Sequence, residues 1–131
     1  MIYLDDNMNN TKKIDSLLDK AKKTEEKIKN FSEILDDLNS IEEKRKSLWK
    51  EIYQNAVSDR ERASILFTEA YKSMGTSSTD HVAIGPTMSK YLERMCKSNE
   101  QILHLADLIN KTEQSESRMD PEDLFSKIVE T

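Results

Sequence analysis

The side chains that could do chemistry in this chain are few. Two histidines, His81 and His104, and one cysteine, Cys96, occur among 131 residues. Glu100 and His104 stand four residues apart, which would put both on one side of a helix, where they could share a metal ion. A metal site in a helical bundle needs several inward carboxylates and more than one such pair. We therefore expect a solvent-side contact at Glu100 and His104, and no metal.

Motifs for catalysis are missing as well. The sequence contains no Gly-rich phosphate loop, no G-x-S-x-G turn and no H-E-x-x-H run. The single cysteine excludes an intramolecular disulfide and a cysteine-based zinc site. Cys96 follows Met95 on the side of its helix that we expect to be packed, which predicts a buried, unreactive thiol. We expect neither enzymatic activity nor a cofactor.

The composition indicates an all-α protein without a large core. Of its residues, 36% are apolar and 34% charged, whereas globular chains average about 45% and 25%. With two glycines and two prolines, the chain has little turn material, and its abundant Lys, Glu, Leu and Ile favour helices. No apolar run approaches the ~20 residues needed to cross a bilayer, and the first residues do not form a signal peptide. We expect a cytoplasmic protein with no membrane partner.

Both glycines, Gly75 and Gly85, lie in one short segment between two amphipathic patterns. On each side the apolar residues recur at helical spacing, and after the segment they step by four and three, as in a coiled-coil seam. The first pattern comprises Ala63, Leu66, Phe67, Ala70, Tyr71 and Met74, and the second Met88, Leu92, Met95, Asn99, Ile102, Ala106 and Ile109. We predict a long antiparallel, coiled-coil-like helical hairpin over residues 58–112.

The ends of the hairpin's arms depend on the glycine segment. Gly75 suits a left-handed cap at the end of the first arm. The second arm starts either early, at Ser78 or Thr79, with a kink at Gly85-Pro86, or later, with Pro86 in its first turn.

The N-terminal part is predicted to be a flexible segment, 1–10, followed by a slightly basic helical arm, 11–57. Asn9 and Asn10 are plausible helix caps, and Ser40 with Glu43 and Ser58 with Glu61 fit the capping box. These signals favour a first helix with a narrow apolar stripe and a second over 41–56. One bent helix from 41 to 74, or even from 11, is the alternative. The side chains expected to point inward from the second helix are Leu48, Trp49, Ile52 and Tyr53.

The C-terminal part, 113–131, is predicted to be an acidic linker followed by a short partner-binding helix. Asp120-Pro121-Glu122-Asp123 combines an acidic cap, proline at the first helical position and acids in the first turn. Such a short helix is unstable alone, so we expect it to fold against a partner. The contact residues would be Pro121, Leu124, Phe125 and Ile128.

The hairpin carries more apolar surface than two helices can cover. Tyr91, Leu105 and Leu108 flank the predicted seam, and soluble monomers rarely expose such a strip. It therefore predicts contacts between copies, unless helix 41–56 folds back over it. Asn99 either fixes the register of the seam or lies half in water. The predicted oligomer interface comprises Ile65, Tyr91, Leu92, Met95, Asn99, Ile102, Leu105 and Leu108.

The charge distribution suggests a weak contact with nucleic acid. The chain has a net charge of −5, but residues 11–50 carry eleven Lys or Arg against nine Asp or Glu. One copy would bind DNA feebly, and many copies in a ring would gain avidity. Besides Lys20, the candidate phosphate contacts are Lys22, Lys23, Lys27, Lys29, Lys44, Arg45, Lys46 and Lys50.

Two stretches resemble a known family. Ala63-Ser-Ile-Leu-Phe-Thr-Glu-Ala-Tyr-Lys and Met95-Cys-Lys-Ser-Asn-Glu-Gln-Ile-Leu-His-Leu, joined by a Ser/Thr/Asp turn, are similar to the central region of small terminase subunits of T4-like tailed bacteriophages. The similarity covers roughly residues 50–112, with Asn99, Ile102, Leu103 and Leu105 as the chief identities, and the acidic tail resembles the family's C-terminal segment.

This resemblance implies a non-enzymatic viral DNA-packaging factor in the host cytoplasm. Its hairpins would assemble into a ring, engage double-stranded viral DNA and regulate the motor and nuclease of the large terminase subunit. The tail would contact that subunit or the portal. Many small terminases carry an N-terminal helix-turn-helix, whereas residues 11–57 contain no glycine turn and no clear recognition helix. The alternative function is a coiled-coil scaffold or regulatory adaptor with no nucleic-acid role.

Overall fold

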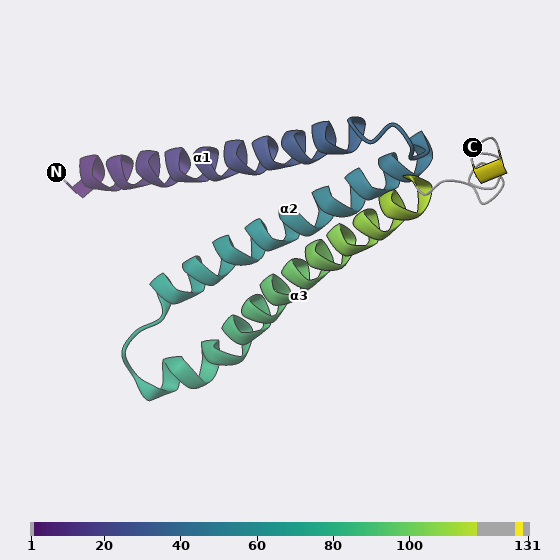
Figure 1. The fold of residues 1–131 in the computed structure, drawn as a ribbon. Helices are drawn as coiled ribbons and strands as arrows, with labels where there is room; N and C mark the ends of the chain where they lie inside the picture. The colour runs from purple at the N-terminus through teal and green to yellow at the C-terminus, as the bar shows by residue number, and fades with distance from the viewer. Residues whose placement is uncertain (1, 118–127, 130–131) are drawn as a thin grey trace.

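The structure, a computed structural model, describes residues 2–117 and 128–129, and the described chain is built from three long helices (Figure 1). They are α1 (Ile2–Asp36), α2 (Glu43–Ser73) and α3 (Ser78–Ser117). Within the described ranges no residue forms a strand. The all-α prediction is confirmed for this part of the chain. Helix α2 runs antiparallel to both of its neighbours and contacts each of them.

The first two helices begin at places that differ from the predicted caps. Helix α1 starts at Ile2, so Asn9 and Asn10 lie inside the helix and do not cap it. The cap of α2 is Glu42, whose backbone is extended and whose side chain makes no capping bond. The Ser40–Glu43 capping box therefore does not form. Ser58 lies in the middle of α2, which confirms one continuous helix over this region.

Gly75 lies in the turn between α2 and α3, where a side chain would lack space and where the backbone is not left-handed. Neither glycine has a positive φ, so the predicted left-handed cap at Gly75 is wrong. The backbone N–H of Met74 ends α2 by donating to the carbonyl oxygens of Ala70 and Tyr71. A Cβ atom at Gly75 would collide with the carboxylate of Asp80. The N–H of Asp80 in turn donates to Ser77 Oγ at 3.2 Å.

Helix α3 takes the earlier of its two predicted starting points. It begins at Ser78 and contains Pro86, so proline lies within the helix rather than in its first turn. At its other end the helix continues to Ser117, through part of the predicted linker.

The seam of α3 differs from the predicted seam. At every second seam position, the structure uses the residue that precedes the predicted one. Its least exposed side chains again step by four and three, and they are Ile84, Met88, Tyr91, Met95, Ser98, Ile102, Leu105, Ile109 and Thr112. Asn99 is exposed and accepts a 2.8 Å hydrogen bond from Arg60 Nη1 of α2, so Asn99 is not a seam residue. Cys96 is also exposed, which corrects the predicted buried thiol.

A buried serine takes the place of the predicted asparagine in the seam. Ser98 has 0% of its surface exposed. Its Oγ atom has no hydrogen-bond partner among the described residues. A polar group that is buried without a partner lowers stability, so Ser98 is a weak point between α2 and α3.

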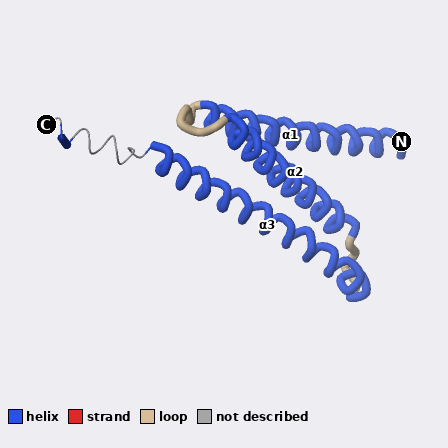
Figure 2. The backbone as a smooth tube through the Cα atoms, turned by 90° about the vertical axis from the view of Figure 1, so that its right-hand side faces the viewer, coloured by secondary structure: helices blue, strands red, loops and turns tan. Residues whose placement is uncertain are grey.

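The main apolar core lies where α1 ends, α2 begins and α3 ends. Three elements contribute to it, so the N-terminal arm does pack back onto the rest of the chain (Figure 2). The rings of Phe31 and Tyr53 stack there with centroids 4.0 Å apart. Leu48 and Ile52 point outward instead of inward as predicted. The core comprises Leu35, Ile41, Trp49, Leu105 and Ile109, with Phe31, Leu38 and Tyr53 packed against it.

Beyond this core α1 and α2 move apart. Both views show the two helices diverging from their junction toward the N-terminus (Figures 1 and 2). Near the open end an ion pair, Lys13 Nζ to Glu69 Oε2 at 3.0 Å, connects them. The exposed apolar side chains Ile14 and Leu18 lie on this part of α1. The divergence leaves a groove between the helices.

Candidate polyanion-binding groove

The groove between α1 and α2 is lined by many basic side chains. Three adjoining hollows form it, and they share lining residues, among them Lys13 and Lys20. The hollow nearest the core measures about 270 Å³ and has Val57 of α2 and Met95 of α3 among its lining. The next along the groove toward the N-terminus includes Leu17 and Ile65.

Seven cationic side chains line this groove against two carboxylates. The cations are Lys12, Lys13, Lys20, Lys23, Lys27, Arg60 and Lys72, and the carboxylates are Glu61 and Glu69. Of these, Lys13 is paired with Glu69 and Arg60 donates to Asn99. Within residues 2–117, the ammonium groups of Lys20, Lys23 and Lys27 form no ion pair. A protein of net charge −5 thus concentrates positive charge along one groove.

The spacing of these lysines along α1 suits a polyanion. Lys13, Lys20 and Lys27 follow one another at intervals of seven residues, so they recur on the same side of the helix. From Lys13 to Lys27 the helix rises about 21 Å, at 1.5 Å per residue. A strand of duplex DNA carries a phosphate about every 3.4 Å. The row is therefore long enough to lie beside about six phosphates of one strand.

The predicted phosphate contacts divide between this groove and the core end of the molecule. Lys23 and Lys27 line the groove, together with Lys20. Lys22 and Lys29 are exposed elsewhere on α1 and line none of the three hollows. The other four predicted cations lie near the start of α2.

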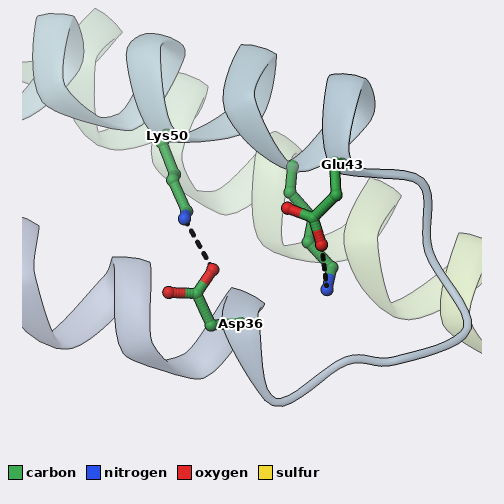
Figure 3. Close-up of polar contacts among 4 residues, drawn as sticks. Asp36, Glu43 and Lys50 are labelled. Carbon is green, nitrogen blue, oxygen red and sulfur yellow. Dashed lines mark hydrogen bonds and ion pairs between the residues drawn. The ribbon is translucent and has the colours of Figure 1, made fainter.

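Three of those four cations are occupied within the molecule, and only Lys44 is simply exposed. Lys50 Nζ lies 2.7 Å from Asp36 Oδ1 and joins α2 to α1 (Figure 3). Arg45 pairs with Glu116 of α3 at 3.4 Å. Lys46 is 2% exposed, with its Nζ 3.5 Å from Glu43 Oε1. The prediction for Lys46 is corrected, because its side chain is buried and is not available to a phosphate.

Four groove cations were not singled out from the sequence: Lys12, Lys13, Arg60 and Lys72. The seven-residue spacing of Lys13, Lys20 and Lys27 was a signal that could have identified the side of the groove formed by α1. Arg60 and Lys72 belong to α2, and no local pattern reveals that α2 faces the lysine row of α1. Their part in the groove depends on the pairing of the two helices.

The structure distributes the predicted oligomer-interface residues over three environments. Ile65, Tyr91, Met95 and Ile102 are half-buried. Leu92, Asn99 and Leu108 are exposed. Leu105 is 3% exposed and belongs to the core with Trp49 and Ile109, which corrects its placement on the interface. The seam shift explains this difference, because it turns residue 105 toward α2.

Two other predicted sites receive little structural information. Pro121, Leu124 and Phe125 of the tail lie outside the described residues, and Ile128 is 65% exposed. Glu100 and His104 are both exposed. Among the described residues, no group of three or more His, Cys, Asp or Glu side chains is arranged to hold a metal ion. None of the helices in the described part is both long and apolar enough to cross a membrane.

Comparisons of the chain with protein-family models, with curated protein sequences and with solved structures give no match.

Proposed function

We propose that the protein is a non-enzymatic DNA-packaging factor of the small-terminase type, which self-associates, engages double-stranded DNA and regulates a large terminase motor. The observation that carries the DNA-binding part is the lysine-rich groove between α1 and α2. Its unpaired lysines can neutralise phosphates and release counterions, a contribution that is independent of base sequence. The contact we propose is accordingly one to the DNA backbone.

Self-association is the second part of the proposal. Leu92, Leu103 and Leu108 remain exposed on α3, outside the seam that packs on α2. Leu92 and Leu103 lie on one flank of α3 and Leu108 on the other, so helices of two neighbouring copies would remove these side chains from water, at a gain of about 25 cal/mol per Å² of apolar surface. We infer that copies pack side by side through α3 into a ring. A ring would align several basic grooves, so that contacts that are weak singly add up.

The third part concerns the C-terminal tail. Its sequence combines acids with Leu124, Phe125 and Ile128, and it follows a helix that ends beside the core. We propose that the tail reaches the large terminase subunit or the portal, as the resemblance to small terminases implies.

The DNA-binding part is tested by two double variants that change the same charge at the same spacing. Lys20→Gln with Lys27→Gln alters the groove, and Lys22→Gln with Lys29→Gln alters the outer side of α1. Duplex affinity is measured by fluorescence anisotropy at several salt concentrations. The groove variant should bind more weakly, and the slope of log affinity against log salt should fall by about two. The control should match the parent protein.

Equal losses in both double variants would refute a role for the groove. Sedimentation velocity tests self-association separately, and a monomer at micromolar concentration would contradict the ring.

A coiled-coil scaffold or adaptor without a nucleic-acid role is the second candidate. The observation that favours it is the pairing of Arg45, Lys46 and Lys50 with acids of the same chain, which removes three predicted phosphate contacts. If this candidate is right, the protein self-associates, but adding it to labelled duplex DNA does not change the fluorescence anisotropy of the DNA, even at low salt.

A further inference from the structure

A second groove lies between α2 and α3, away from the basic groove. It measures about 650 Å³ and combines an apolar surface with positive charge. Leu66 and Tyr91 are the large apolar side chains of its lining, and Leu66 is 48% exposed. Arg62, Lys90 and Arg94 stand around them. Such a surface suits an acidic segment that also carries large apolar side chains.

The charges within this groove leave a positive excess. Lys97 Nζ lies 3.0 Å from Glu93 Oε1, so these two side chains largely neutralise each other. The hydrogen bond and charge of Lys97 lower the pKa of Glu93, with smaller contributions from Arg94 and Lys90. Asp59 is then the one remaining carboxylate facing Arg62, Lys90 and Arg94 in the lining of this groove.

We propose that this groove binds the C-terminal segment 120–129 of a second copy of the chain. That segment begins with Asp120, Glu122 and Asp123 and continues with Leu124 and Phe125. Its acids match the cations of the groove, and its apolar side chains match the surface of Leu66 and Tyr91. The segment therefore offers both kinds of side chain, acidic and apolar, that the groove can bind.

The length of the chain keeps the part of the segment that carries this match, residues 120–125, away from Tyr91 of its own groove. Tyr91 lies 26 residues before Ser117, which is about 39 Å along α3. From Ser117 to Phe125 there are eight residues, which span at most about 28 Å when fully extended. Leu124 and Phe125 therefore cannot reach Tyr91 of their own copy. The tail of a neighbouring copy has no such restriction.

This inference rests on the self-association in the proposed function and extends it. The tail of each copy would occupy the α2–α3 groove of the next, which links copies in addition to their packing through α3. A motor protein that recruits the tail would have to displace it from this groove.

The test uses the full chain with Phe125 replaced by the photo-crosslinker p-benzoylphenylalanine. Equal amounts of ¹⁴N- and ¹⁵N-labelled protein are mixed, irradiated and analysed by mass spectrometry. Crosslinks that join a light and a heavy peptide come from different copies. We expect such mixed crosslinks to residues 59–66 and 90–97.

A pair of charge variants tests whether the cations of the groove are responsible. Lys90→Glu with Arg94→Glu should reduce the mixed crosslinks by about tenfold, which corresponds to a loss of about 1.4 kcal/mol. Lys22→Glu with Lys29→Glu makes the same change of charge on the outer side of α1 and should leave them unchanged.

The outcomes separate this inference from the proposed function. An oligomer in sedimentation that yields no mixed crosslinks, or mixed crosslinks only to α1, overturns the tail-binding groove and leaves self-association intact. A monomer at the crosslinking concentration overturns both.

Discussion

Replacing Ser98 by alanine is expected to stabilise the protein. The serine hydroxyl is buried and has no hydrogen-bond partner among the described residues. Removing an unpaired buried hydroxyl gains about 1 kcal/mol, and alanine's higher helix propensity adds about 0.5 kcal/mol. Ser98→Ala should therefore raise the free energy of unfolding by about 1.5 kcal/mol.

The matched control is Ser89→Ala on the same helix, where the serine is exposed. It changes helix propensity alone and should gain about 0.5 kcal/mol. Both variants are compared with the parent by urea unfolding at one protein concentration, because association adds to apparent stability. If Ser98→Ala gains no more than Ser89→Ala, Ser98 is not a buried seam residue.

A second pair of variants tests the register of the seam directly. Ser98→Leu should destabilise the protein by about 1–3 kcal/mol, because a large side chain overfills the closely packed seam. Asn99→Leu, on the exposed side, should stay within about 0.5 kcal/mol of the parent. If Asn99→Leu destabilises the protein more than Ser98→Leu does, the result supports the seam predicted from the sequence, in which residue 99 faces α2.

Four further variants test the core, the groove and the Lys97–Glu93 pair. Trp49→Ala should lower the free energy of unfolding by about 3–5 kcal/mol in urea titrations, since it empties the centre of the core. Lys46→Met should leave duplex affinity unchanged, whereas Lys23→Met should weaken it and reduce the salt slope by about one. In Lys97→Gln, NMR titration of the side-chain carboxyl should show the pKa of Glu93 rising toward its ordinary value. Because Lys97 lowers this pKa, the stabilisation by the pair is present above the ordinary pKa and is lost as pH falls through the lowered one. An unchanged Glu93 pKa would contradict the 3.0 Å contact.

The helical architecture could be read from the sequence because it depends on local composition and on long periodic patterns. The apolar residues before Gly75 and after Pro86 have helical spacing, and the chain turns between them. The local signals at helix ends were less informative. The capping box at Ser40 and Glu43 was present in the sequence, but the turn that packs Ile41 into the core delays the start of α2.

The seam was misassigned because two interleaved patterns fit α3 almost equally well. Met88, Met95, Ile102 and Ile109 belong to both patterns. The patterns differ in whether Leu92, Asn99 and Ala106 or Tyr91, Ser98 and Leu105 lie between them. Hydrophobicity favours Leu92 at the first of these positions but Leu105 at the last, so it does not decide between the two patterns. The path of α2 decides for Tyr91 and Ser98, and that is a tertiary property.

The basic residues also show which features depend on tertiary structure and which can be predicted from the sequence. The lysines of α1 were visible as a cluster, so Lys23 and Lys27, which line the groove, were among the predicted phosphate contacts, and that role stays a prediction. The burial of Lys46 was not predictable, because its neighbours in sequence are charged. It follows from the return of α1 and the end of α3 onto the first turns of α2.

The one-sided placement of the core has a dynamic consequence for α1. Large apolar side chains hold its last turns in the core, whereas none of the described residues of its N-terminal half belongs to the core, and an exposed ion pair connects this half to α2. Local opening costs least where few buried contacts must break. Backbone amides of α1 should therefore exchange with solvent deuterium progressively faster from Leu35 back toward Met8, so that the helix behaves as an arm hinged at its C-terminal end. The width of the groove between α1 and α2 would then adjust to the diameter of the nucleic acid that binds in it.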